Sequence, residues 1–250
     1  MFFLFFIFFV CYNTVIGGDF IHKNIKKLLL KFNIAIFWYI YKLKKLKNKK
    51  NEGYTFVKKL VLKINNKLKV QFNVIGLENI PHNSNYTIFC NHRGLYDPMA
   101  VITFIDDNLA FAMKQSLSEN PLTGSIAAAT GSKFLMRNPK DDLKVIIEMI
   151  DEAKNGQNFL IFPEGTRNEA DELLEFKAGA FKVPQKSGCD ILPVAISGSE
   201  YIFDKKGKQQ EIVISFLPII KYDSFKDIKT SQLSKQVREI IQKEYKKISS

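Results

Sequence analysis

The chain has 250 residues, of which 46% are hydrophobic, and it carries a formal net charge of +12. This length and apolar content exclude a disordered chain and favour one folded domain with additional chain at one end. The charge is uneven, because residues 1–70 carry 15 lysines and two acidic residues, whereas residues 71–250 carry a net charge of −1. A nucleic-acid-binding domain would carry a basic face of its own, so this distribution argues against that class.

The three cysteines form no recognisable ligand or disulfide pattern. Cys11, Cys90 and Cys189 lie far apart, and no CxxC or Cys/His spacing is present. We therefore expect neither a disulfide framework nor a metal site, and the odd number favours a reducing compartment. Cys90 ends an apolar run and is predicted to be a core residue.

Two apolar segments and a lysine-rich stretch make up the N-terminus. Phe2–Tyr12 is entirely apolar, Leu28–Tyr41 is a second and interrupted apolar stretch, and residues 42–50 contain six lysines and no acidic residue. A membrane-spanning helix needs about 20 apolar residues, so the first stretch is marginal and the second is too short.

Three interpretations of this segment are open: a secretory signal peptide, one spanning helix over Phe2–Ile16, or two helices that lie in one leaflet. The signal peptide is disfavoured because no basic residue precedes the apolar run and no clear cleavage site follows. We favour the two interfacial helices, since the second apolar stretch also needs a place to lie. In both membrane interpretations the lysines stay on the cytoplasmic side, so residues 1–50 are predicted to anchor the chain to the cytoplasmic face of the cell membrane.

After residue 50, apolar strands alternate with helical segments, and no repeat or second domain is evident. Strands are predicted at Val70–Ile75, Tyr86–Cys90, Leu109–Met113, Lys133–Met136, Asn158–Phe162, Ile191–Ser197 and Glu211–Ile219. Helices are predicted at Met99–Ile105, Pro121–Thr130, Asp141–Lys154, Phe176–Gln185 and Ser231–Ile248, with the clearest helical spacing in the third and the last. This alternation predicts an α/β fold for residues 51–250, with a mostly parallel sheet covered by helices.

A histidine and an aspartate follow the second predicted strand. His92 comes two residues after the strand ends, and Asp97 comes five residues later, where a helix is expected to begin. A histidine held by an aspartate is the minimal arrangement for taking a proton from a hydroxyl at neutral pH. The same residues fit a structural interpretation, in which Asp97 is the N-cap and Pro98 the first residue of the helix. Spacing alone leaves both interpretations open.

A second chemical segment, Phe162–Arg167 with the sequence FPEGTR, follows the fifth predicted strand. Gly165 permits a tight turn with an open amide, and Arg167 offers a planar fork suited to phosphate. Glu164 would accept hydrogen bonds from a hydroxyl or hold Arg167 in place; a plain turn with a surface ion pair is the alternative. Ligands bind at the carboxyl ends of parallel strands, so we expect this loop and the His92 loop to converge.

Together, NHRGLYD and FPEGTR resemble the glycerolipid (lysophospholipid) acyltransferase family, of the 1-acylglycerol-3-phosphate acyltransferase type. That family has NHxxxxD and FPEGTRS motifs at about this separation. Residues 131–137 (GSKFLMR) and 191–196 (ILPVAI) resemble two further family blocks, and residues 176–181 (FKAGAF) match the segment after FPEGTR. The resemblance covers residues 70–220 in the family's order.

The resemblance implies transfer of a fatty acyl group from acyl-carrier protein (ACP) or acyl-CoA to lysophosphatidic acid, giving phosphatidic acid. It implies that His92 deprotonates the acceptor hydroxyl and that Asp97 holds the ring. It also implies that three cations bind the acceptor phosphate: Lys114, Arg137 and Arg167. The loop residues implied to shape this phosphate subsite are Glu164, Gly165 and Thr166. The acyl thioester is a co-substrate, and no further cofactor is implied.

Two departures from the family pattern leave the acceptor open. Met136 stands where the second block usually has aspartate, and Asn168 where the third usually has serine. Another lysophospholipid or a lyso-aminolipid is therefore an alternative acceptor. A hydrolase in which His92 activates water is a further alternative, as is a non-catalytic membrane adaptor, although retention of both His92 and Asp97 argues against the adaptor. The sequence contains neither a GxSxG elbow nor a well-placed cysteine, so we expect no covalent acyl-enzyme.

Overall fold

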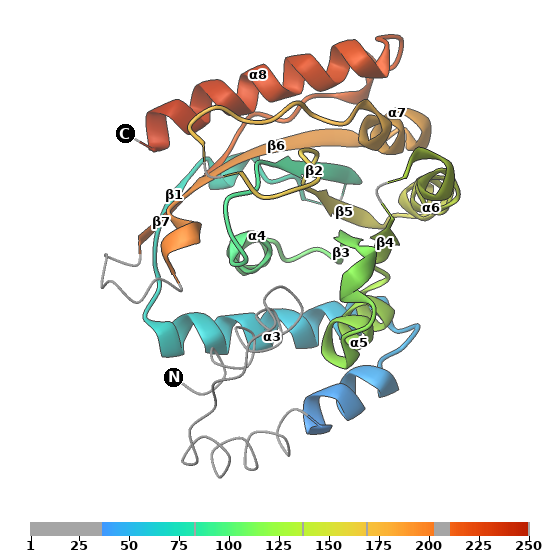
Figure 1. The fold of residues 1–250 in the computed structure, drawn as a ribbon, viewed down its shortest axis with the longest axis vertical. Coiled ribbons are helices and arrows are strands. Elements are labelled where there is room, and N and C mark those ends of the chain that lie inside the picture. The colour runs from blue at the N-terminus through green and yellow to red at the C-terminus, as the bar shows by residue number, and fades with distance from the viewer. Residues whose placement is uncertain (1–36, 83, 137, 169, 203–210, 250) are drawn as a thin grey trace.

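The computed structural model describes residues 37–249 except residues 83, 137, 169 and 203–210 (Figure 1). Within this part the strands form one sheet in the order β1-β7-β6-β2-β5-β3-β4. The strands are β1 (Gln71–Ile75), β2 (Tyr86–Cys90), β3 (Leu109–Lys114), β4 (Lys133–Leu135), β5 (Asn158–Ile161), β6 (Asp190–Ser197) and β7 (Glu211–Phe216). The α-helices that begin and end within this part are α3 (Lys50–Leu68), α4 (Asp97–Phe104), α5 (Pro121–Thr130), α6 (Pro139–Lys154), α7 (Lys182–Ser187) and α8 (Thr230–Ile248).

The direction of the strands decides which loops meet. β6, β2, β5, β3 and β4 are parallel, whereas β7 runs antiparallel to β6 and pairs in parallel with β1. The predicted α/β fold with a mostly parallel sheet is therefore confirmed. Five strands end at the same edge of the sheet, so the loops that follow them lie near one another.

Helices cover both faces of the sheet (Figure 1). α3, α4 and α5 pack on one face, and α6, α7 and α8 pack on the other. The central strand β2 sends Tyr86, Ile88 and Cys90 into the first layer and Phe89 into the second, as the alternation of side chains along a strand requires. Burial on both faces explains why this strand is a continuous apolar run in the sequence.

Helix α3 lies outside the predicted elements. Tyr54, Val57, Leu60 and Ile64 recur with helical spacing and are buried in the core that α3 shares with α4 and α5. The lysines between them, including the exposed Lys59 and Lys63, conceal this pattern. Gly53 brings α3 against α5, because a Cβ built on it would lie 2.1 Å from the backbone oxygen of Ala129.

The helix predicted at Phe176–Gln185 begins later than expected. Its first part is extended, a 3₁₀ turn covers Ala178–Phe181, and α7 follows. The amide of Lys177 donates to the carbonyl of Pro163 at 2.9 Å, so this segment is bonded to the FPEGTR loop instead of starting a helix.

Only part of the predicted membrane anchor is described. The helix predicted at Phe2–Ile16 and most of the second apolar stretch lie outside the described residues. Residues 37–45 are helical, with Leu43 fully buried in the core and Phe37 and Tyr41 exposed. None of the described helices has both the length and the apolar run that crossing a bilayer requires. The division of the chain at residue 50 stays a prediction.

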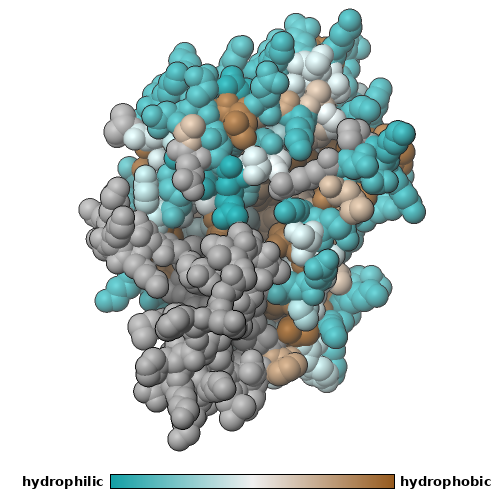
Figure 2. All heavy atoms as spheres, in the orientation of Figure 1, coloured by the Kyte–Doolittle hydropathy of each residue, from teal (hydrophilic) through white to brown (hydrophobic). Residues whose placement is uncertain are grey.

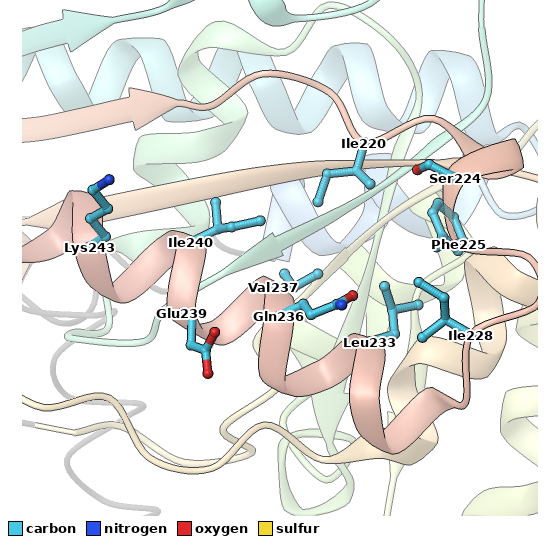
Figure 3. Close-up of a pocket in the computed structure, with 10 residues that line it drawn as sticks. All are labelled: Ile220, Ser224, Phe225, Ile228, Leu233, Gln236, Val237, Glu239, Ile240 and Lys243. Carbon is cyan, nitrogen blue, oxygen red and sulfur yellow. The ribbon is translucent and has the colours of Figure 1, made fainter.

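A groove of about 440 Å³ lies between α8 and the segment that follows β7 (Figure 3). Its apolar lining includes Ile220 and Phe225 from that segment and Val237 and Ile240 from α8. Ile220 pairs with Ile191 near the start of β6, so the groove lies away from the edge where the parallel strands end. The outer surface over α8 is mostly hydrophilic (Figure 2).

Candidate active site

The loop between β2 and α4 holds the predicted histidine and aspartate together. Nδ1 of His92 lies 2.6 Å from Oδ2 of Asp97, and Asp97 is fully buried, whereas the His92 side chain is 20% exposed. An ionised carboxylate only accepts hydrogen bonds, so Nδ1 donates and Nε2 carries the lone pair. No residue that the structure describes bonds to Nε2. The expected contact is present, and its catalytic role stays a prediction.

Asn91 explains why the chain leaves the sheet at His92. Its side-chain amide donates to the carbonyl of Ile196 at 3.0 Å, and its side-chain oxygen accepts the amide of the same residue at 2.8 Å. The side chain thus takes the place of backbone in the β2–β6 ladder. The backbone after Asn91 is free to turn, and His92 projects from the edge of the sheet.

Every described donor around Asp97 lies on the turn after β6 or on the loop between β2 and α4, which is called the catalytic loop below after the predicted role of His92. Oδ2 also accepts the amides of Arg93 and Gly94, at 2.6 and 2.9 Å, and Oδ1 accepts the hydroxyl of Ser199. The alternative N-cap role is wrong: Tyr96 occupies the N-cap position, and Asp97 is the first helical residue. Its carboxylate points back to the loop because those donors lie there.

The FPEGTR loop converges on the catalytic loop as predicted. β5 pairs directly with β2, so the two loops leave adjacent strands. The Phe162 ring stacks on the His92 imidazole, with 4.2 Å between centroids and 22° between planes. The amide of His92 donates to Oε1 of Glu164 at 2.9 Å, and the amide of Asn168 donates to the carbonyl of His92 at 2.9 Å.

Glu164 and Arg167 have different surroundings, although both belong to the same loop. Glu164 is buried, and its second oxygen accepts the amide of Leu174 at 2.9 Å. Glu164 therefore braces the loops and does not hold Arg167. Thr166 and Arg167 are exposed, and Arg167 makes no ion pair with any described residue. Gly165 has a φ of +72°, which side-chain-bearing residues rarely adopt.

One further predicted cation, Lys114, lies farther along the same edge. Lys114 is exposed at the end of β3, beside Leu135 of β4. β3 is two strands from β2, which corresponds to about 10 Å. Arg137 lies outside the described residues, so its role stays a prediction. Met136, which departs from the family pattern, is exposed, and its amide donates to Oδ1 of Asp142 at 2.6 Å.

Arg93, which was not among the predicted site residues, joins several parts of the site. Its guanidinium donates to the carbonyls of Asn168 and Ala170 at 2.8 and 2.7 Å and to Oε1 of Glu200 at 3.1 Å. It also lies over the Tyr245 ring of α8, 5.2 Å from the centroid. With its side chain only 6% exposed, Arg93 connects the catalytic loop to the FPEGTR loop, to the turn after β6 and to α8.

The turn after β6 is a third component of the site that the sequence predictions missed. This 3₁₀ turn, η4 (Ser199–Tyr201), packs directly on the catalytic loop, because a Cβ on Gly94 would lie 2.9 Å from the Cα of Glu200. One signal was present: a strand parallel to the His92 strand delivers its following residues to the same edge. The pattern did not indicate which of those residues is buried against Asp97.

Below the histidine, burial raises the pKa of the Cys90 thiol, and the nearby Asp97 and Glu164 carboxylates raise it further. A thiol in this environment stays neutral and is a poor nucleophile. Its full burial confirms the prediction that Cys90 belongs to the core. Within the described part of the chain, no group of three or more His, Cys, Asp or Glu side chains could hold a metal ion.

Comparison with known proteins finds relatives that are named for the same enzyme. A 1-acyl-sn-glycerol-3-phosphate acyltransferase of Borreliella burgdorferi is 28% identical over 179 residues, covering 70% of this chain and 72% of the relative. An enzyme of the same name from Escherichia coli is 27% identical over 161 residues, covering 63% of this chain and 66% of the relative. The crystal structure of the LPA acyltransferase PlsC from Thermotoga maritima shares the fold, with a TM-score of 0.62 and 23% identity over 98% of this chain and 88% of that chain.

A model of the family described as Acyltransferase matches residues 71–197, just over half of the chain. The matched segment runs from β1 to the end of β6. It therefore contains the hydrogen-bonded His92 and Asp97 and the FPEGTR loop that converges on them. On this evidence the chain belongs to the acyltransferase family.

Proposed function

We propose that this protein transfers a fatty acyl group from an acyl thioester to the free hydroxyl of lysophosphatidic acid, forming phosphatidic acid. One observation carries the proposal: His92 is bonded through Nδ1 to a buried carboxylate and has no described partner at Nε2, next to a loop whose Arg167 makes no ion pair with a described residue. The relatives from Borreliella burgdorferi and Escherichia coli are named for this reaction, which supports it further.

In the proposed reaction His92 acts as the general base. Nε2 takes the proton of the acceptor hydroxyl, and the oxygen attacks the thioester carbonyl; a C–O bond forms and the C–S bond breaks. The departing thiolate then receives the proton from the imidazolium. Asp97 accepts the hydrogen bond from Nδ1 throughout and stabilises the positive charge of the ring. Base catalysis of this kind contributes about 10²–10⁴-fold to a rate.

Arg167 is proposed to bind the phosphate of the acceptor, together with Arg137 and Lys114. A guanidinium that makes no ion pair with a described residue can meet a phosphate with two parallel hydrogen bonds. The acyl donor is proposed to be acyl-ACP or acyl-CoA. Beyond this thioester, the reaction as written needs no cofactor.

Purified protein in detergent is expected to acylate lysophosphatidic acid faster than monoacylglycerol, which lacks the phosphate. Arg167→Ala should raise the KM for lysophosphatidic acid about 10–100-fold with little change in kcat, because a charge-assisted hydrogen bond contributes roughly 1.5–3 kcal/mol. Initial rates with acyl-ACP and with acyl-CoA, and mass spectrometry of the product, measure these quantities.

Lys221→Ala is a suitable control, since Lys221 is an exposed cation beside Asp190 at the other end of β6. Its KM should match that of the unmodified protein. If the protein prefers another lysophospholipid or a lyso-aminolipid, that lipid takes the place of lysophosphatidic acid as the proposed acceptor. Equal rates with and without an acceptor phosphate, or acid release without any acceptor, would contradict the proposal.

We also propose that the N-terminal segment holds the enzyme on the cytoplasmic face of the cell membrane. The helix over residues 37–45 exposes Phe37, Trp38 and Tyr41 to 70%, 49% and 53%. Lys42 and Lys45 lie over two of these rings, 5.5 Å from that of Trp38 and 4.7 Å from that of Tyr41. Exposed aromatic rings flanked by lysines are typical of helices at the boundary of an anionic leaflet.

Vesicle binding tests this placement. The triple variant Phe37→Ser, Trp38→Ser, Tyr41→Ser should need about tenfold more phosphatidylglycerol-containing lipid for half-binding, a loss of about 1.4 kcal/mol. Flotation of the full chain with vesicles measures it. The control variant Leu77→Ser, Ile240→Ser removes exposed apolar side chains elsewhere and should bind like the unmodified chain. Equal binding of the aromatic triple variant and the control would refute the role of this helix.

A further inference from the structure

The turn that follows β6 places a serine hydroxyl against the carboxylate of the candidate site. Ser199 and Asp97 are both fully buried, and the hydroxyl of Ser199 donates to Oδ1 of Asp97. We propose that Ser199 is a positioning residue, which holds Asp97 and through it His92 in the orientation for acyl transfer. This proposal rests on the function proposed above and extends its histidine–aspartate pair to a third residue.

The bonds of the two carboxylate oxygens show why the serine matters. Oδ2 of Asp97 is shared by Nδ1 of His92 and the amides of Arg93 and Gly94. Among the described residues, Ser199 is the donor to Oδ1. Without this hydroxyl a buried carboxylate oxygen would lack a partner, and the carboxylate could rotate to share the remaining donors.

The backbone around Ser199 is fixed on both sides, so the hydroxyl has a defined position. Gly198 has a φ of +83°, and a Cβ there would lie 2.3 Å from the backbone oxygen of Glu211 on β7. On the other side, Glu200 accepts hydrogen bonds from Nε and Nη2 of Arg93 at 3.3 and 3.1 Å. The turn is therefore attached to the sheet and to the catalytic loop at once.

This arrangement predicts an effect on kcat and not on acceptor binding. Ser199 contacts the carboxylate, whereas Arg167, proposed to bind the acceptor phosphate, belongs to a different loop. A misoriented imidazole slows proton transfer after the acceptor has bound, which lowers kcat and leaves KM in place. If Ser199 contributed only to stability, its replacement would lower the melting temperature without changing kcat and KM differently.

Five variants test the proposal in the full chain, with lysophosphatidic acid and one acyl donor. Ser199→Ala should lower kcat about tenfold, equivalent to about 1.4 kcal/mol, with KM changed less than twofold. Ser199→Thr keeps a hydroxyl, whereas Ser199→Val introduces a side chain of nearly the same shape as threonine but without the hydroxyl. The threonine variant should therefore have a higher kcat than the valine variant. In an Asp97→Asn background, Ser199→Ala should cause no further loss, because residues that act as a unit are not additive.

Three results would overturn the proposal: unchanged kcat in Ser199→Ala, equal kcat in the threonine and valine variants, or the same tenfold loss in the Asp97→Asn background. Urea midpoints of each variant show that the compared proteins are folded. The unmodified chain serves as the first arm of the experiment. If it does not acylate lysophosphatidic acid the proposed function fails, whereas normal turnover with an unaffected Ser199→Ala rejects only the positioning role.

Discussion

Replacing His92 with alanine should lower the rate of acyl transfer about 10²–10⁴-fold while the protein stays folded. The imidazole is the only described side chain that combines a bond to buried Asp97 with a ring nitrogen open to a ligand. Without it no described side chain beside Asp97 is placed to take the proton of the acceptor hydroxyl. Single-turnover rates at saturating acceptor measure the loss, because they report the chemical step and not product release.

A histidine elsewhere in the chain provides the matched control. His82 is exposed in the segment before β2, and His82→Ala should leave the rate unchanged. His92→Ala removes a ring that stacks on Phe162, so its circular dichroism and urea midpoint are compared with those of the control. Full activity of a folded His92→Ala protein would reject the base mechanism.

Replacing Arg93 with methionine should lower the free energy of unfolding by about 3–5 kcal/mol, since removal of one member of a buried ion pair leaves the other charge uncompensated. Arg93 and Glu200 have side chains only 6% and 14% exposed. The substitution also removes donors from two loop carbonyls and the cation above the Tyr245 ring. Urea unfolding of the purified protein measures the change.

The double variant Arg93→Met, Glu200→Gln separates the cost of the uncompensated Glu200 charge from the cost of the lost contacts with the loop carbonyls. It removes the uncompensated charge, so it should be more stable than Arg93→Met alone, although the lost carbonyl contacts keep it below the unmodified protein. Activity should fall with stability in the single variant, because Arg93 connects both loops of the site. A single variant within 1 kcal/mol of the unmodified protein would show that these loops hold together without Arg93.

Much of the fold could be predicted because its strands are buried on both faces. Tyr86–Cys90 reads as a continuous apolar run, and the structure has a strand with the same bounds at the centre of the sheet. Helix α3 escaped prediction because lysines and a threonine lie between its buried Tyr54, Val57 and Leu60. The extended start of residues 176–185 escaped because it depends on a bond to Pro163, a contact that no local pattern contains.

By itself the sequence determined the α/β fold class and the meeting of the His92 loop with FPEGTR. These follow from apolar periodicity and from the rule that parallel strands end at one edge. The spacing of His92 and Asp97 left both a paired role and a helix-cap role open, and the structure shows that the two side chains are bonded. Only the tertiary structure decided that Glu164 braces two loops and that Arg93 and Ser199 belong to the site. Those roles depend on hydrogen bonds between residues about 70–110 positions apart, such as Ser199 with Asp97, and such distant contacts are not encoded in any local pattern.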